Sequence, residues 1–429
     1  MTNQACGLWG HRDFMRLWGA QAVSSFGARI AREGLPMAAV ITLKAGPQAL
    51  GLFAALTLGA QAAVGLFAGA LADRLPKRRL LIAADIARAV VLAAIPLAAL
   101  TGRLTLIDIY LAAVLLGAAN VVFDIADHAY LPSLIDTADL TEGNARLSAT
   151  EAVAEVGGPA LTGVLVSLIA PPIAVGLNAL TYVASALILS RIGGGARSQA
   201  PVAPSPVAPS PVAPAEPAGL DLTAGLRLVL VHPLVRPLWL ADVCKSFFGY
   251  FFAALYILLA LNVLKLTTPM LGLTIAMGGV GGLAGAALAP WLTRRLGPGR
   301  MILLAGLAGG AALLLVPLAA GPPIVAMTIL ALSQLVGDAL QTTAGIGSAT
   351  LRQTILPPEQ LGRAGGAFAT GAAAAGVAGA LVGGALGAAI GPRETLLVAA
   401  AGVTAASLFV VFSPLRNLVS APADKTHPL

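Results

Sequence analysis

Long apolar segments recur along the whole chain, and short polar or basic turns separate them. A helix of about 20 apolar residues is long enough to cross the hydrocarbon core of a bilayer. The pattern therefore predicts an all-α polytopic membrane protein with twelve transmembrane helices. The expected spans are 14–43, 50–72, 80–101, 105–131, 146–170, 173–191, 234–264, 269–292, 301–320, 323–351, 365–390 and 394–415.

The positions of the basic residues predict the orientation of these spans. The chain has 26 Lys and Arg residues, and most of those between spans lie on the side of the two termini. The opposite side has only Lys44, Arg103, Lys265 and Arg393. Because Lys and Arg concentrate in cytoplasmic loops, we expect both termini to be cytoplasmic and the protein to lie in a bacterial inner (cytoplasmic) membrane.

Composition agrees with this class. The chain is 58% hydrophobic and 10% charged, with a mean hydropathy of +0.87, which excludes an ordinary soluble domain. The net charge of +7 does not indicate nucleic-acid binding, because the basic residues are spread over short turns rather than gathered on one face. No cleavable signal peptide is expected. Cys6 and Cys244 are expected to be free thiols.

The chain divides at a segment of different composition. Residues 200–217 repeat Pro, Ala, Val and Ser, which cannot build a core and favour an extended tether. A docking site for a protein partner is the alternative interpretation of this Pro-rich segment. The expected organisation is an N-terminal six-helix bundle at 1–191, a cytoplasmic linker at 192–232, a C-terminal bundle at 233–416 and a cytoplasmic tail at 417–429.

An internal repeat relates the two bundles. A shift of 221 residues, the distance from His11 to His232, also places Trp18 on Trp239 and Lys44 on Lys265. Because that shift spans six expected helices, both bundles have the same orientation. Parallel repeats of this kind are a known transporter construction, with the binding site where the halves meet.

Ionisable residues inside spans are costly, and each indicates a functional site. Span one carries Gln21, Ser25, Arg29, Arg32 and Glu33 on one polar stripe. Arg29 and Glu33 are four residues apart, so we expect them to pair directly. These charges align with uncharged residues in the second bundle, so they are expected to serve function rather than fold construction.

Further polar residues follow in other spans. We expect proton coupling at Glu33, with Asp124 and Asp338 as the other candidates. The expected substrate-binding residues are Gln21, Ser25, Arg29, Arg32, Asn120, Lys245, Gln334 and Gln341. Two arginines beside one carboxylate leave a guanidinium free, which predicts a preference for substrates with an anionic group. In the alternative interpretation Arg32 pairs with Asp124 or Asp338, and no net positive site remains.

The turn after the second span carries the pattern Gly69-x-x-x-Asp73-Arg74-x-x-x-Arg78-Arg79. It resembles the signature loop of the major facilitator superfamily, although Pro76 stands where that family usually has Gly. The resemblance implies two six-helix bundles, cavity-lining helices one, four, seven and ten, and alternating access with this loop as a cytoplasmic gate.

The same resemblance suggests structural roles for other residues. Asp127 is expected to meet Arg78 in the gate network, and Asp85, Arg88 and Glu155 are expected to form a second network. Gly158-Pro159 resembles the Gly-Pro motif of the antiporter branch. The segments Leu131-Pro132-Ser133-Leu134-Ile135 and Leu351-Arg352-Gln353 resemble the exporter branch that contains the enterobactin and macrolide exporters.

The resulting hypothesis is a proton-coupled secondary exporter of an amphipathic small molecule, such as a siderophore or a drug-like compound. The expected partners are this substrate, protons and membrane lipids, with no nucleic acid, and the expected oligomeric state is a monomer. The alternatives are a lysophospholipid flippase or facilitator, and a non-transporting membrane receptor or assembly partner. No phosphate-binding Gly-Lys-Ser loop, metal-ligand cluster or catalytic triad is present, so no cofactor, metal or enzymatic activity is expected.

Overall fold

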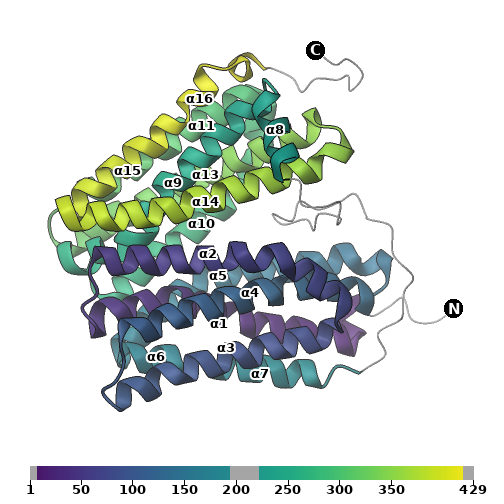
Figure 1. Ribbon diagram of the computed structural model, residues 1–429, viewed down its shortest axis with the longest axis vertical. Helices are drawn as coiled ribbons and strands as arrows, with labels where there is room; N and C mark the ends of the chain where they lie inside the picture. Colours follow the sequence, from purple (N-terminus) through teal and green to yellow (C-terminus); the bar gives the residue numbers. More distant parts are fainter. Residues whose placement is uncertain (1–6, 194–221, 419–429) are drawn as a thin grey trace. The chain divides into compact units, whose positions relative to one another are not determined.

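The computed structural model describes residues 7–193 and 222–418, and every regular element within them is helical (Figure 1). The first half of the chain forms η1 (Gly7–Gly10), α1 (Arg12–Thr42), α2 (Pro47–Arg74), α3 (Lys77–Leu100), α4 (Leu106–Leu134), η2 (Thr137–Asp139), α5 (Leu140–Leu168), α6 (Pro171–Leu177) and α7 (Ala179–Ser190). The second half forms α8 (Leu222–Val231), α9 (Val235–Leu258), the π-helical turn η3 (Leu259–Val263), α10 (Thr268–Leu296), α11 (Pro298–Leu313), α12 (Leu315–Leu318), α13 (Pro323–Ile355), α14 (Pro358–Ile390), α15 (Pro392–Ala406), α16 (Leu408–Val411) and η4 (Pro414–Asn417). The all-α fold class is confirmed.

These helices correspond closely to the predicted spans. Eleven helical segments of the described residues are long and apolar enough to cross a membrane. The helix α1 has 31 residues, which is also long enough at 1.5 Å per residue. It does not reach the same apolar threshold because Arg29, Arg32 and Glu33 interrupt its hydrophobic sequence. With α1 included, the arrangement agrees with the twelve predicted spans.

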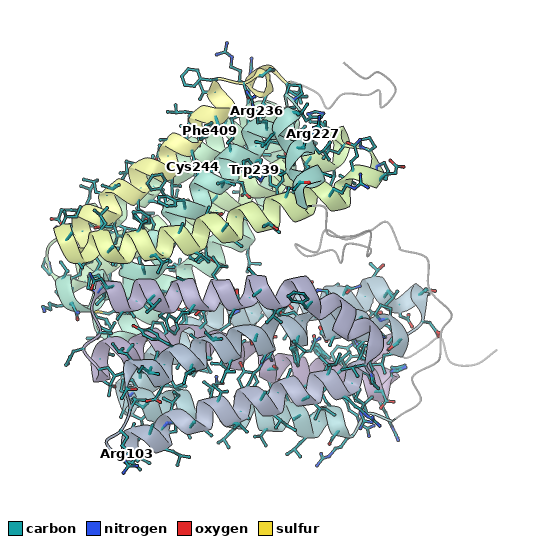
Figure 2. All side chains as sticks on the ribbon, viewed as in Figure 1. Arg103, Arg227, Arg236, Trp239, Cys244 and Phe409 are labelled. Atoms are coloured by element: carbon teal, nitrogen blue, oxygen red, sulfur yellow. The ribbon has the colours of Figure 1, made fainter. Side chains whose placement is uncertain are left out.

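One helix was not predicted. Residues 192–232 were assigned to a linker, but α8 occupies the end of that segment. Its Gly225 lies so close to α14 that an added Cβ would be 2.7 Å from the Arg363 carbonyl oxygen, and Val229 is fully buried. The apolar residues that follow the Pro-rich repeat therefore pack on the bundle, with Arg227 on the exposed side (Figure 2). The repeat itself, 200–217, lies outside the described residues.

The internal repeat has a counterpart in the backbone. Lys44 and Lys265, which the shift aligns, have φ values of 54° and 55°, and they are the only non-glycine residues with positive φ in the part of the chain that the structure describes. Each ends a helix in the same way, because Ala45 N–H donates to the Ala39 carbonyl and Leu266 N–H to the Ala260 carbonyl. A main-chain bond donated by the residue after a left-handed residue closes the end of a helix. The two halves therefore share a helix-ending turn as well as sequence landmarks.

The described residues fall into two compact units. Residues 7–45 and 56–193 form unit 1, and residues 46–55 and 222–418 form unit 2. In unit 1, α1 packs against α5 and α7, and α3 packs against α4 and α7. In unit 2, α13 packs against α10 and α11, and α9 packs against α14 and α15.

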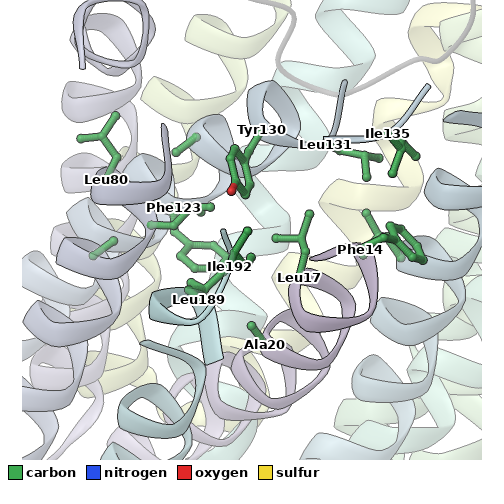
Figure 3. Close-up of a cluster of buried hydrophobic side chains, with 14 of the residues drawn as sticks. Phe14, Leu17, Ala20, Leu80, Phe123, Tyr130, Leu131, Ile135, Leu189 and Ile192 are labelled. Atoms are coloured by element: carbon green, nitrogen blue, oxygen red, sulfur yellow. The ribbon is translucent and has the colours of Figure 1, made fainter. Parts of the chain in front are cut away.

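A cluster of buried apolar side chains holds together one end of unit 1 (Figure 3). Phe14 and Leu17 from the start of α1 meet Phe123 and Tyr130 from α4, and Leu189 near the end of α7. The same end carries polar contacts, since Arg16 Nη1 donates to the Arg191 carbonyl at 2.7 Å. Cations beside the free carbonyls at a helix end are favourable.

In unit 2, glycines allow helix backbones to touch. A Cβ added at Gly285 of α10 would be 2.1 Å from the Ala339 carbonyl oxygen of α13, and one at Gly281 would be 2.4 Å from the Leu335 carbonyl oxygen. Small residues at such crossings replace the hydrophobic driving force that is absent between helices in lipid. The α10–α13 contact, the most extensive of unit 2, therefore depends on Gly281 and Gly285.

We expect Gly285→Ala to destabilise the protein by about 1–3 kcal/mol, because overpacking against a backbone atom cannot be relieved by a rotamer change. Gly345→Ala on α13 is the matched control, because nothing lies within 4 Å of its added Cβ. Thermal unfolding of the purified variants in detergent measures the difference. Equal melting temperatures for the two variants would contradict this account of the crossing.

Candidate functional site

The polar stripe of α1 forms a four-residue ion-pair cluster in unit 1. The Arg29 guanidinium lies 2.5 Å from one carboxylate oxygen of Glu155 on α5. Arg32 binds the other Glu155 oxygen at 2.9 Å and Glu33 at 2.9 Å. Glu155 thus accepts two guanidinium contacts and Glu33 accepts one. We call these four residues, Arg29, Arg32, Glu33 and Glu155, the α1–α5 cluster.

The Gly-Pro motif explains why α5 reaches α1 at this level. A Cβ added at Gly158 would be 2.4 Å from the Arg29 Cβ, so only glycine allows this approach. Glu155 lies about one turn earlier on the same helix and is thereby brought to both arginines. Pro159 follows inside α5. The motif therefore has a local structural consequence, the assembly of the α1–α5 cluster.

The pairing within the cluster differs from the expected one. We predicted an Arg29–Glu33 pair from their spacing, but Arg29 pairs with Glu155 and Glu33 pairs with its neighbour Arg32. Two arginines and two glutamates give the cluster no net charge. The argument that Arg32 leaves a free guanidinium for an anionic substrate therefore fails, because a second carboxylate supplied by α5 was not included in it. Arg32 remains half exposed.

A second ion pair is fully enclosed in unit 1. Asp85 and Arg88 of α3 lie 3.2 Å apart, with side chains 0% and 2% exposed. Ser24 of α1 donates to Asp85 at 3.3 Å and accepts from Arg88 at 3.2 Å. The guanidinium also lies over the rings of Phe123 at 4.2 Å and Tyr182 at 5.2 Å, which is a favourable cation–π geometry. Glu155, expected in this network, belongs to the α1–α5 cluster instead.

The polar residues of α4 lie near the same helices. Asp127 is buried, and its Oδ1 atom has no hydrogen-bond partner among the described residues. Gln21 of α1 approaches it, and the Asp124, His128 and Glu151 side chains act on it electrostatically. The Nδ1–H of His128 donates to the Asp124 carbonyl at 2.7 Å, so the ring is hydrogen-bonded to the preceding turn of its own helix. Asn120 also has a buried oxygen without a partner in the described part.

The expected gate contact between Asp127 and Arg78 is not formed. Arg78 instead donates to the carbonyl of Leu189 at 3.0 Å and to that of Ser190 at the end of α7. A guanidinium near the start of α3 therefore caps the last turn of α7. Arg79 is exposed. The side chains of Gly69, Asp73 and Arg74 lie outside the described residues.

Unit 2 carries a different set of polar side chains. On α13, Gln334 and Asp338 face α10, because a Cβ added at Gly278 would be 2.4 Å from Asp338 Oδ2 and 3.6 Å from Gln334 Nε2. Arg352 of the same helix stacks on Phe368 at 4.1 Å. Lys245 on α9 points towards α11, with its Nζ 3.4 Å from the Cβ position of Gly306.

Some polar residues of these sites were not predicted. Ser24 was passed over in favour of its neighbour Ser25, which is half-buried, although Ser24 binds both members of the buried pair. Ser407 lies 2.8 Å from the Cβ position of Gly306, and its Oγ has no partner among the described residues. The internal repeat could have indicated Ser24, because the shift of 221 residues aligns it with the ionisable Lys245. Nothing in the local sequence distinguishes Ser407.

The described residues contain no group of His, Cys, Asp and Glu side chains arranged to hold a metal ion. Cys244, labelled on α9 in Figure 2, is a free thiol, and its Sγ lies 4.0 Å from the Gly402 carbonyl. Cys6 lies outside the described part of the chain.

Solved structures with the same arrangement are transporters. The chain matches a bacterial homologue of the iron transporter ferroportin in its inward-facing state, with 17% identity, a TM-score of 0.70, and coverage of 93% of this chain and 98% of that one. The nucleoside transporter NupG matches with 13% identity, a TM-score of 0.72, and coverage of 94% and 98%. A bacterial homologue of the human lysosomal transporter Spinster matches with 14% identity, a TM-score of 0.69, and coverage of 96% and 98%. At these identities the likeness shows the fold alone.

A search of curated proteins gave no match. The profile of the Major Facilitator Superfamily matches residues 17–369, which include the whole of unit 1 from the first span onward and most of unit 2. This family consists of membrane transporters rather than enzymes. With two units of membrane-spanning helices, an internal parallel repeat and ionisable clusters inside its spans, the chain belongs to the Major Facilitator Superfamily.

Proposed function

We propose that this multi-pass membrane transporter is a proton-coupled exporter of an amphipathic small molecule. The observation that carries the proposal is the α1–α5 cluster. Its four charges lie inside membrane helices, where ionisable groups are expensive and mark ion or substrate pathways. Coupling transport to protons requires an ionisable group whose protonation changes the charge of a site inside the membrane.

The cluster offers such a group. Protonating Glu33 breaks one ion pair, with Arg32, while Arg32 keeps its bond to Glu155. Protonating Glu155 would break contacts to both arginines. The proton is therefore best carried by Glu33, with Glu155 as the residue that holds the arginines. Binding one proton changes the charge of the cluster from zero to plus one, which biases any equilibrium between states that expose it to different sides.

The cargo class and the direction are proposed from the sequence. Two of the similar structures are named for different cargo, one as a homologue of an iron transporter and one as a nucleoside transporter, so the shared fold does not select a substrate. The exporter direction rests on the resemblance of residues 131–135 and 351–353 to the enterobactin and macrolide exporters. The charge distribution supports cytoplasmic termini in an inner membrane.

Flux in proteoliposomes tests the proposal. The full chain is reconstituted into lipid vesicles, and the vesicles are loaded with a fluorescent amphipathic compound. A pH gradient is then imposed across the vesicle membrane. We expect efflux that accelerates when the gradient is imposed and stops when a protonophore collapses it, with protein-free vesicles as the control. Gradient-independent movement of a labelled lysophospholipid, without gradient-driven efflux, would favour the flippase alternative and overturn proton coupling.

A further inference from the structure

We propose that Lys245, Ser407 and Gln341 form a binding point in unit 2 for an anionic oxygen group, a carboxylate or phosphate monoester, on the transported substrate. This inference rests on the proposed transport of an amphipathic molecule and assigns the anionic group of that molecule to these three residues. We call these three residues the Lys245 cage.

The first observation is geometric. Lys245 Nζ and Ser407 Oγ lie 3.4 Å and 2.8 Å from the Cβ position of Gly306 on α11. Gln341 of α13 packs against α11 one turn after Gly306, where its Cγ lies 3.3 Å from the Cβ position of Gly309. The two glycines thus leave room that side chains from α9, α13 and the end of α15 enter. Lys245 is half-buried, so it is the accessible member of the cage.

The second observation is that the cage presents donors without acceptors. Among the described residues, no hydrogen bond or ion pair joins Lys245 Nζ to a protein group, and Ser407 Oγ and Gln341 Nε2 are buried without partners. Ser407 is 2% exposed. An ammonium, an amide N–H and a hydroxyl can all donate to one oxyanion. Buried donors without partners are costly, so a ligand that satisfies them is favoured.

The carboxylate nearest to the cage does not pair with it. Asp242, one turn before Lys245 on α9, acts electrostatically on both Lys245 and Arg352, but it forms no ion pair with either within the described part of the chain. Asp242 therefore acts on Lys245 from a distance and does not occupy its N–H donors. These donors stay open to an anionic oxygen group.

The third observation comes from the repeat. The shift of 221 residues, from His11 to His232, places Ser24 on Lys245, Asp85 on Gly306 and Arg88 on Gly309. In unit 1 the buried cation Arg88 has its own carboxylate, Asp85. In unit 2 the cation is Lys245 of α9, and the residue aligned with Asp85 is Gly306. At the position of Asp85, unit 2 therefore has no oxyanion, and we infer that the substrate supplies one there.

Restoring the internal carboxylate tests this inference. Gly306→Asp would place a carboxylate beside Lys245, as Asp85 lies beside Arg88, and Gly306→Ala adds the same Cβ without the charge. Ser407 Oγ, the nearest atom to that Cβ, can rotate away. The other variants are Lys245→Met, which removes the cation at similar size, and Lys265→Met, which removes an exposed lysine of the same unit.

The probes are 4-phenylbutyrate and its uncharged amide, 4-phenylbutyramide, added to the purified full chain in detergent. We expect the carboxylate, but not the amide, to raise the melting temperature of wild type and Lys265→Met by about 2–4 °C at several times its dissociation constant. Gly306→Ala should keep a smaller rise, because its Cβ displaces Ser407 but leaves Lys245 in place. Lys245→Met and Gly306→Asp should show no such rise. Without ligand, Lys245→Met should melt no lower than wild type, because it removes a poorly solvated charge.

Stabilisation of Lys245→Met equal to that of wild type would overturn the inference. So would stabilisation by sodium chloride alone, which indicates a free-ion site, or by phosphatidic acid alone, which indicates a lipid site. None of these measurements uses a pH gradient. Failure here with normal gradient-driven efflux removes only the cage, whereas binding without efflux removes proton coupling and leaves the cage in place.

Discussion

Glu33→Gln is expected to abolish proton-driven transport while leaving substrate binding within about twofold of wild type. Glutamine keeps the size of the side chain and can still accept a bond from Arg32, but it cannot take up a proton. The cluster then stays in one charge state, and a pH gradient has no group through which to act. Gradient-driven efflux and substrate-induced thermal stabilisation, measured on the same preparation, check the two parts of this prediction.

Glu142→Gln is the matched control. Glu142 pairs with Arg146 one turn away on α5, so this change also replaces an arginine-bound glutamate, but outside the α1–α5 cluster. Transport by this variant should be unchanged. Glu155→Gln, in contrast, should lower stability as well as flux, because Arg29 and Arg32 both lose a carboxylate. Normal gradient-driven efflux by Glu33→Gln would move the coupling role to Asp124 or Asp338.

Asp85→Ala is expected to destabilise the protein by about 3–5 kcal/mol, the usual cost of leaving one member of a buried ion pair without its partner. Arg88 is 2% exposed and cannot reach water when Asp85 is removed. Its bonds to Ser24 and to the Ala119 carbonyl and its contacts with two rings remain, but none supplies a negative charge.

The double variant Asp85→Leu with Arg88→Met is expected to cost less than Asp85→Ala alone. Replacing a whole buried pair by apolar residues is often nearly neutral, and the second bundle has glycines at both aligned positions. Thermal or denaturant unfolding in detergent measures both variants, with Glu142→Gln as a surface-pair control expected to cost less than about 1 kcal/mol. If Asp85→Ala lost no more stability than the control, this result would contradict an enclosed ion pair between Asp85 and Arg88.

The membrane-spanning helices of this protein could be predicted from the sequence with each end within seven residues of the observed one. Spans predicted at 323–351 and 365–390 are α13, Pro323–Ile355, and α14, Pro358–Ile390. The larger of the two differences is at the start of α14, where Pro358 at the first position favours an earlier helix start. Only α8 was missed, because its ten residues are too few to cross a membrane and follow a Pro-rich segment.

Partners across helices were much less predictable. The stripe on α1 was visible from its spacing, but the spacing predicted an Arg29–Glu33 pair and gave no reason to add Glu155. Likewise Arg78 was paired with Asp127 on the basis of charge, whereas it caps α7 through main-chain carbonyls. Every helix exposes carbonyls at its end, and the sequence does not say which cation reaches them.

The sequence by itself determined the number and length of the spans, the parallel repeat, and which helices carry ionisable residues. These properties are local, because bilayer thickness and the cost of burying a charge act on each helix separately. The tertiary structure decided which charges meet. The α1–α5 cluster exists because Gly158 allows α5 to approach Arg29, and the Lys245 cage exists because Gly306 leaves room beside Lys245. Close packing between helices distant in sequence, rather than spacing along one helix, therefore selects the partner of each buried charge.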